Sequence, residues 1–406
     1  TIDISSIPLE GQLRADFPKL NGLMQQLTGE GKNTMQGALK ADVDFKGDTG
    51  SSFTAQGEIL LKDFSLGEQG KRTIEDLDIQ LRPEFNLSGG AERLALSAIL
   101  LLDKTPLVIN GQFRDLQKRP VGKLTLSSQQ GIDLEELGPK FPVMHQAINV
   151  KGKLDLTGDL IVPAQGTPLF SLDANSPRMN ITLAKKQKGE TQEAPPEKKK
   201  PVKKQAQKRS TLDARGSFRV KEGTFEGSAF KDLICMGEMQ GGEIKITRFS
   251  FGAFDGTLVG SGNINIAEET AAYNIKAKVS DVDANAIFSN LVSWKNMMKG
   301  TFNGDVMLGG EGLSLDSIRQ NLTGSGTVHV KEGELTWVNL IGRIVQTLGG
   351  KGVEKEKTTF EDLTGNFTVK NGMITLPNLL ISHEDMDLKL WGDIGLDMKL
   401  KMDGEA

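Results

Sequence analysis

Apolar and polar residues alternate with a period of two over most of this chain, which is the pattern of β-strands that bury one face. The clearest stretch is residues 387–402, where Leu388, Leu390, Ile394, Leu396, Met398, Leu400 and Met402 fall on one side. Sixteen residues at about 3.3 Å each would span roughly 50 Å, which is long for a globular strand. We therefore expect Gly392 or Gly395 to mark a turn or a bulge.

Helical periodicity is rare in the same sequence. The better candidates place apolar residues on one helical face, and a Gly349-Gly350 pair would end the last of them. They are residues 286–298, 314–321 and 338–348, with weaker candidates at 18–28 and 133–137. These helices are too few to cover the sheets that the remaining chain predicts.

Short strand-pair units recur along the chain. Residues 216–225, 326–335 and 365–374 align as copies of one unit, and residues 37–45, 152–160 and 300–308 align as copies of a second. Asn371-Gly372 predicts a tight hairpin turn, because both residues tolerate positive φ. We expect Glu222-Gly223 and Glu332-Gly333 to form the same turn. Repetition of an amphipathic hairpin favours an architecture that grows by adding strands along one axis.

One segment departs from this pattern. Residues 185–209 consist mainly of Lys, Gln, Glu and Pro, with Val202 as their one large apolar side chain. Such a composition cannot bury enough surface to offset the entropy of ordering. We expect a disordered basic linker or loop, either a solvated spacer or a contact with anionic lipid head groups. It separates an N-terminal β-rich segment, residues 1–184, from a C-terminal module, residues 210–406.

Composition limits the possible functions. The 47 glycines among 406 residues indicate many turns, bulges and close strand approaches. The net charge of −4 predicts no general attraction to nucleic acid. A single cysteine, Cys235, fits the cytoplasm or a bacterial periplasm. The sequence has no apolar run of 18 residues and begins at Thr1, so we expect it to be a piece of a longer protein whose membrane anchor lies outside it.

No motif assembles a catalytic, metal or nucleotide site. The histidines His145, His329 and His383 are far apart and lack ligand-like spacing. The run 349–352 lacks the spacing of a phosphate-binding loop and follows a predicted helix. No nucleophile, base and orienting residue come together. We therefore expect no enzyme activity, no cofactor and no metal.

An antiparallel sheet with one apolar face must bury that face. It can pack on another sheet as a sandwich or close into a barrel, and periodicity alone favours the sandwich. It can also stay open and bury something other than protein, and a lipid with long alkyl chains fits that alternative. Two acyl chains carry about 30 methylenes at roughly 0.8 kcal/mol each, which exceeds about 20 kcal/mol. A protein that moves such a lipid needs an apolar surface without interruption.

Residues 247–403, about 40% of the chain, resemble the AsmA-like family of Gram-negative envelope proteins. The resemblance rests on the order of short glycine-rich motifs. They are Phe251-Gly-Ala-Phe-Asp255-Gly256, Gly260-Ser-Gly262-Asn-Ile264-Asn-Ile266, Val282-Asp-Ala-Asn-Ala-Ile287, residues 300–310, 315–326 and 333–340, Phe360-Glu-Asp-Leu363-Thr-Gly365-Asn-Phe367, and Asn371-Gly372. Residues 1–184 share only the general texture, and the basic linker matches no part of the pattern.

The resemblance implies a mainly β protein, with elongated, curved antiparallel sheets that form a groove with an apolar inner face, plus a few short helices. It also implies a periplasmic protein, anchored to the inner membrane by an N-terminal helix absent from this sequence. Its expected function is non-enzymatic transport of phospholipid, held by its acyl chains, between the inner and outer membranes, with envelope proteins as further possible partners. The alternative is an assembly factor for outer-membrane proteins with a self-covered β-sandwich core.

If the groove exists, the alternating apolar residues of the C-terminal module should line it. They are Ile264, Ile266, Tyr273, Ile275, Val279, Phe302, Val306, Leu308, Val328, Val330, Phe367, Val369, Leu388, Leu390, Ile394, Leu396, Met398 and Leu400.

Overall fold

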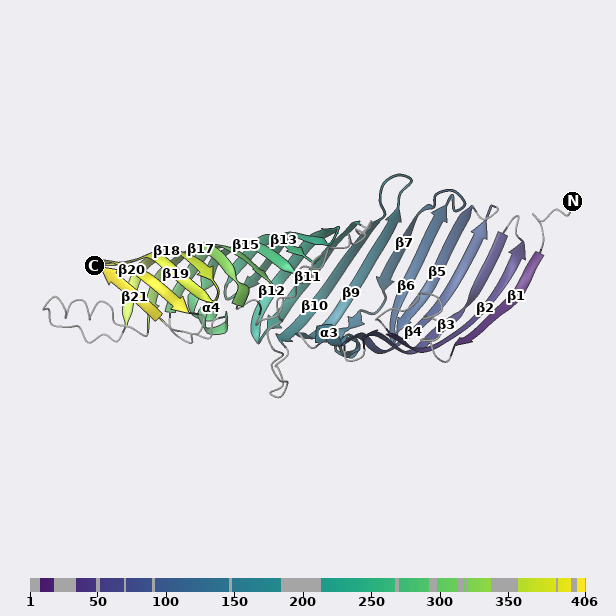
Figure 1. Ribbon diagram of the computed structural model, residues 1–406, viewed down its shortest axis with the longest axis horizontal. Coiled ribbons are helices and arrows are strands. Elements are labelled where there is room, and N and C mark those ends of the chain that lie inside the picture. The colour runs from purple at the N-terminus through teal and green to yellow at the C-terminus, as the bar shows by residue number, and fades with distance from the viewer. Residues whose placement is uncertain are drawn as a thin grey trace, which may run out of the picture. The chain divides into compact units, whose positions relative to one another are not determined.

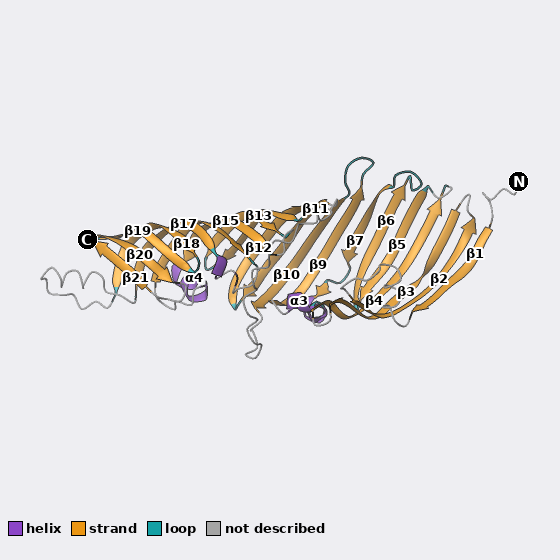
Figure 2. Ribbon diagram, viewed as in Figure 1, coloured by secondary structure: helices purple, strands orange, loops and turns teal. Residues whose placement is uncertain are grey.

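The chain folds into two compact units, Thr1–Gly216 (unit 1) and Ser217–Ala406 (unit 2). The computed structural model shown in Figure 1 describes residues 8–17, 34–48, 52–68, 71–89, 92–145, 148–183, 213–266, 270–291, 298–312, 317, 320–336, 357–384, 386–395 and 400–405. The predicted basic linker lies outside the described residues. Each unit is mainly β-strand, which confirms the predicted fold class (Figure 2).

Unit 1 contains an antiparallel sheet in which strands that follow one another along the chain lie side by side. The strands are β1 (Pro8–Phe17), β2 (Thr34–Asp48), β3 (Ser52–Glu68), β4 (Lys71–Ser88), β5 (Arg93–Leu102), β6 (Thr105–Arg114), β7 (Val121–Ser128), β9 (Ile148–Val162) and β10 (Leu169–Leu183). A short strand, β8 (Ile132–Asp133), pairs with β9. This order is what repeated hairpins produce.

Unit 2 follows the same rule. Its strands are β11 (Asp213–Phe225), which contains the boundary between the units, and then β12 (Ser228–Gln240), β13 (Glu243–Ala253), β14 (Gly256–Asn265), β15 (Ala272–Asp283), β16 (Met298–Glu311), β17 (Thr323–Leu335), β18 (Thr358–Lys370), β19 (Met373–His383), β20 (Met386–Gly395) and β21 (Leu400–Glu405). From β12 to β21, every strand pairs antiparallel with the next one.

β-bulges bend several of these strands. Asp63 (φ 51°), Asp232 (φ 52°) and Asp281 (φ 55°) have positive φ, and the register shifts beside each of them. Aspartate tolerates the left-handed region better than most residues. An extra residue in one strand kinks that strand and increases its twist. The sheets therefore curve near one end of their strands.

A short helical segment covers that end of unit 1. It comprises α2 (Leu134–Leu137), η2 (Gly138–Lys140) and α3 (Pro142–His145), between β8 and β9. The Asp133 carboxylate caps α2 by accepting hydrogen bonds from the backbone N–H groups of Glu135 (2.9 Å) and Glu136 (3.4 Å). Leu137 is buried against Leu77, Leu107 and Ile132. The helix predicted at residues 133–137 is therefore confirmed.

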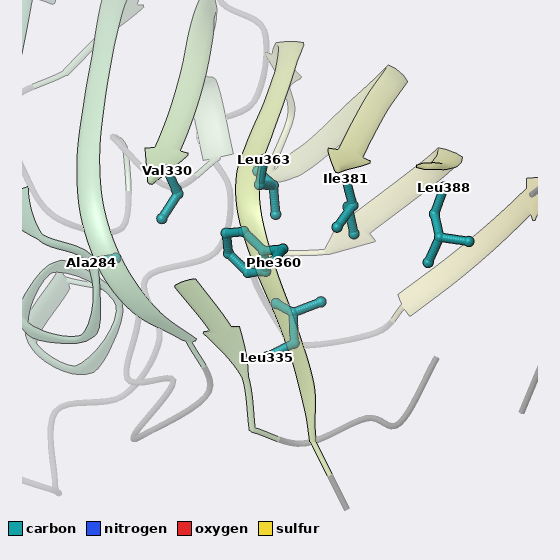
Figure 3. Packing of buried hydrophobic residues seen from close by; sticks show 7 residues of the cluster. All are labelled: Ala284, Val330, Leu335, Phe360, Leu363, Ile381 and Leu388. Carbon is teal, nitrogen blue, oxygen red and sulfur yellow. The ribbon is translucent and has the colours of Figure 1, made fainter. Parts of the chain in front are cut away.

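The corresponding end of unit 2 holds α4 (Ala284–Leu291). Around it lies a core of seven buried residues from β17–β20 and α4, shown in Figure 3: Ala284, Val330, Leu335, Phe360, Leu363, Ile381 and Leu388. The predicted helix 286–298 begins earlier than expected, and its predicted end at Met298 is wrong because Met298 starts β16 and packs on this core. The candidates at 18–28 and 338–348, and most of 314–321, lie outside the described residues.

Two of the three predicted hairpin turns are wrong. Asn371 (φ 49°) and Gly372 (φ 76°) do join β18 to β19, as expected. However, β11 continues through Glu222-Gly223 and turns at Glu226-Gly227 instead. Glu332 (φ 48°) lies within β17, where a positive φ bends the strand without reversing it. The strand then continues so that Leu335 reaches the core.

The long alternating stretch 387–402 breaks where glycine suggested. β20 ends at Gly395 and β21 begins at Leu400. Among the described residues, no second sheet packs face to face on either unit's sheet, because the extensive strand contacts join hydrogen-bonded neighbours. The described residues therefore form open sheets rather than the sandwich that periodicity alone favoured.

Candidate functional site: the apolar faces of the two sheets

Residues that lie directly opposite each other on neighbouring strands share a face of the sheet. In unit 1 the register therefore defines rows that cross the strands. One row crosses all nine strands through Gly11, Phe45, Ala55, Phe85, Leu96, Gly111, Leu124, Leu160 and Phe170. It contains no charged residue.

The neighbouring rows of unit 1 are equally apolar. On one side lie Leu9, Gly47, Phe53, Leu87, Leu94, Phe113, Gly122 and Val162. On the other side, nearer the helical segment, lie Ala15, Ala41, Ile59, Leu81, Leu100, Leu107 and Ser128. Between these, Leu13 is 59% exposed. An uncharged surface thus runs across the sheet, and many of its side chains are only half-buried.

Unit 2 has two kinds of apolar row. The first crosses seven strands through Ile275, Leu308, Gly324, Val369, Ile374, Ile394 and Leu400. Ile275, Leu308, Ile374 and Ile394 are half-buried, so they remain accessible at the face. This row is also free of charge.

The second row of unit 2 lies at the end of the strands that α4 covers. It runs through Val282, Phe302, Val330, Leu363, Ile381 and Leu388. Val330, Ile381 and Leu388 are 0% exposed, and Leu363 is 2% exposed. These side chains form the core shown in Figure 3. Val330 and Leu388, which the sequence suggested as groove residues, are therefore core residues in this conformation.

The other predicted groove residues fall into three groups. Ile264, Tyr273, Ile275, Val279, Phe302, Val306, Leu308, Val328, Phe367, Val369, Leu390 and Ile394 share the apolar face, with Val279 and Val369 buried. Leu400 faces Ile394 in the register, whereas Ile266 lies beyond the end of β14 and is 46% exposed. Leu396 and Met398 lie outside the described residues. Their role in binding lipid stays a prediction.

Glycines opposite large side chains are a feature that the sequence did not reveal. A β-carbon at Gly326 would come within 2.7 Å of Cζ of Phe367, and one at Gly11 would come equally close to Cζ of Phe45. The rings therefore lie along the sheet, over the cross-strand glycine. This arrangement keeps large apolar side chains from standing up into the space above the face. It also gives the many glycines a second use besides turns.

Tyr273 is the one tyrosine of the chain, and its polar hydroxyl lies on the apolar face of unit 2. Its ring lies over Gly310, where a β-carbon would come within 2.5 Å of the hydroxyl. The hydroxyl is buried and has no hydrogen-bond partner among the described residues, and burial raises its pKa. It therefore stays neutral at neutral pH, and the face stays uncharged there.

Unit 1 also holds a cleft of about 1060 Å³. The side chains that line it include two rows of polar residues, among them Gln12, Asp44, Gln56, Asn110 and Gln112. The apolar row between them reaches the cleft, whereas the next apolar rows on either side do not. Most of the cleft's lining therefore comes from the two polar rows, and the rest comes from the nine-strand row.

No helix among the described residues is both long enough and apolar enough to cross a bilayer. Within the same ranges, no three His, Cys, Asp or Glu side chains gather as they would to hold a metal ion. Together with the geometry above, the prominent feature of the described chain is an extended apolar surface rather than a reaction centre.

No curated protein and no solved structure matches this chain. The model of the AsmA family matches residues 151–379, which is 229 of the 406 residues (379 − 151 + 1) and therefore more than half of the chain. The matched region begins in β9 and ends in β19, so it includes most of unit 2 and the last strands of unit 1. The chain therefore belongs to the AsmA family.

Proposed function

We propose that this chain transports phospholipid without catalysis, holding the acyl chains against the apolar faces of its sheets. The transport would run between the inner and outer membranes of a Gram-negative envelope and would support outer-membrane biogenesis. We place the protein in the periplasm, anchored to the inner membrane by a segment outside the present sequence. Membership of the AsmA family supports a role in the envelope, either in lipid transport or in assembly.

The continuity of the apolar face is the observation that carries this proposal. In unit 1, three parallel rows cross the sheet without a single charged residue. A charge in such a row would require a passing alkyl chain to displace bound water. Each methylene exposed to that water would cost about 0.8 kcal/mol, so a wet interruption would hinder the passage of a lipid.

The size of the face also fits the ligand. The nine strands of unit 1 make eight inter-strand steps of about 4.8 Å, or roughly 38 Å across the sheet. A lipid tail covers about half of a hydrocarbon core that is about 30 Å thick, or roughly 15 Å. One unit alone can therefore shelter more than one tail length along its rows.

Nothing that the described residues bring together favours the alternative of a self-covered assembly factor. That alternative requires the apolar face to be buried by the protein's own chain. Instead, Ile275, Leu308 and Ile394 stay half-buried, and the helices that the structure describes lie at the strand ends that contain the two cores.

Native mass spectrometry of gently purified protein tests the proposal. We expect bound phospholipid in the wild type, and a loss of most of it in Leu96→Asp, which places a charge in the nine-strand row. Ser97→Asp is the matched control, because Ser97 is the next residue on β5 and faces outward. If the wild type carries no phospholipid at several protein concentrations, the transport proposal fails and the assembly role becomes the better account.

A further inference from the structure

Unit 1 carries a basic cluster at the strand end opposite its helical segment. Arg93 begins β5, Arg114 ends β6, and Lys118 and Arg119 lie in the following turn. The backbone N–H of Leu116 donates to the Glu92 carbonyl at 3.5 Å, which joins this turn to the preceding one. The four cations, all exposed, therefore occupy a small part of the surface.

Two carboxylates, Glu92 and Asp115, lie in the same two turns, so they offset only part of this positive charge. Arg93 and Arg114 lie directly opposite each other on neighbouring strands. Like charges in such a cross-strand pair destabilise the sheet. Arg114 pairs with Asp115 at 3.9 Å, but these side chains are 71% and 57% exposed, so the pair is weak. Among the described residues Arg93 and Lys118 have no anionic partner. The chain as a whole has a net charge of −4, so folding alone does not require cations here.

The cluster borders the apolar face. Leu94 and Phe113, the next residues inward from the two arginines, lie opposite each other in an apolar row that also contains Leu87 and Gly122. By alternation the two arginines share the outward face with Ser97, but they stand at the end of their strands. A lipid whose tails lie on this row and whose head group extends past the strand end would bring its phosphate within one residue of them. Arginine stems can bend over a strand end and keep their charged groups in water.

We propose that Arg93 and Arg114 bind the phosphate of the lipid whose tails lie on the apolar face of unit 1. This inference rests on the proposed function and adds recognition of the head group to it. The guanidinium group suits a phosphate because it can donate two parallel hydrogen bonds. The bound anion also offsets the repulsion between the two arginines. Lys118 and Arg119 strengthen the local positive potential, while Arg119 also donates to the Gly166 carbonyl at 3.2 Å.

A comparison of two lipids tests the inference on the full chain. Phosphatidylglycerol and diacylglycerol with identical acyl chains share their tails, but only the first has a phosphate. We expect the wild type to bind phosphatidylglycerol roughly 30-fold more tightly, as two basic residues near an anionic lipid predict. In the double variant Arg93→Gln/Arg114→Gln this preference should fall to about 1-fold, with diacylglycerol affinity unchanged.

Controls separate this inference from the proposed function. Arg82→Gln removes a cation that is paired with Glu58 in the middle of the sheet, and it should leave the preference intact. The double variant should melt at the same temperature as the wild type or higher, because the repulsion is relieved. Equal binding of both lipids by the wild type would overturn the head-group inference alone. If inorganic phosphate alone binds to the wild type and this binding is lost in the double variant, the two arginines hold free phosphate rather than a lipid head group, and the inference is overturned. Failure of both lipids to bind would overturn the proposed function as well.

Discussion

Phe360 on β18 lies directly opposite Gly333 on β17, and its ring fills the space that a β-carbon at Gly333 would need. Such a carbon would overlap the ring and come within 2.8 Å of the Lys299 carbonyl oxygen. Phe360 is 4% exposed and belongs to the core in Figure 3, so it has little room to move. This single contact shows how glycine and aromatic residues together shape the sheet.

We therefore expect Gly333→Ala to destabilise unit 2 by about 1–3 kcal/mol through overpacking, measured by denaturant unfolding. Gly309→Ala is the control, since its β-carbon would lie 3.3 Å from the nearest atom, the Tyr273 carbonyl oxygen, which need move only by a few tenths of an ångström. Its effect should stay within about 0.5 kcal/mol. Equal destabilisation by both substitutions would show that the ring contact is not the cause.

Leu388 and Leu390 lie two residues apart on one face of β20 and should respond differently to the same substitution. Leu388 is 0% exposed, so Leu388→Asp buries a charge and should prevent cooperative folding of unit 2. Leu390 is only half-buried, so Leu390→Asp should fold but fail to restore lipid transport in a transport-deficient strain.

Thermal melting and complementation by these two variants test the distinction. Lys389→Asp, on the outward face between them, should both fold and complement. A Leu390→Asp protein that folds and still complements would remove the main support for the apolar face as the route.

Lys140, in the helical segment of unit 1, forms a hydrogen bond and an ion pair with residues of the sheet. Its ammonium group donates to the Asp76 carbonyl and pairs with Asp103 at 3.4 Å, with side chains 28% and 17% exposed. We expect Lys140→Met to cost about 1–2 kcal/mol and to increase hydrogen exchange in residues 134–145. Lys104→Met removes a 3.9 Å pair with Glu136 in which Lys104 is 88% exposed. It should change exchange very little, and comparable changes in both variants would contradict the assignment.

Glu334 links three strand regions of unit 2. Lys357 lies 2.8 Å from one carboxylate oxygen and Lys299 lies 3.4 Å from the other. The hydrogen bond from Lys357 lowers the pKa of Glu334, and the charge of Lys299 adds to the effect. The stability that this carboxylate contributes is therefore fully present above about pH 4.5, the ordinary pKa. It is lost as the pH falls through the lower, folded-state pKa.

Denaturant midpoints of the wild type and Glu334→Gln provide the measurement. The wild type should be the more stable protein at neutral pH, and the two should converge as the pH falls through the lowered pKa of Glu334 in the folded state. A difference that persists unchanged at acid pH would mean that the ionised carboxylate is not responsible.

The strand order followed from the sequence because alternation and repetition act locally. Alternation placed residues such as Ile275 and Leu308 on one face, and their cross-strand pairing put them in one row. Glycine after glutamate was less informative. Glu332-Gly333 could form a turn, but it forms a bulge within β17 instead. The strand continues past it, and Leu335 packs in the core of unit 2.

Periodicity also could not separate core from accessible surface. Val330 and Val306 have the same alternation, yet Val330 is fully buried while Val306 is half-buried. The difference arises from α4 and from the curvature of the strands, and both depend on contacts distant in sequence. The stacking of Phe367 over Gly326 was equally hidden, because it requires the register between strands.

Site-specific photocrosslinking in living cells tests the central claim most directly. A photoreactive residue would replace Leu96 or Ile275 on the apolar faces, or their outward neighbours Ser97 and Lys276. We predict that phospholipid is captured at Leu96 and Ile275 and not at Ser97 or Lys276. Equal capture at all four positions, or no lipid at the apolar pair, would contradict the account.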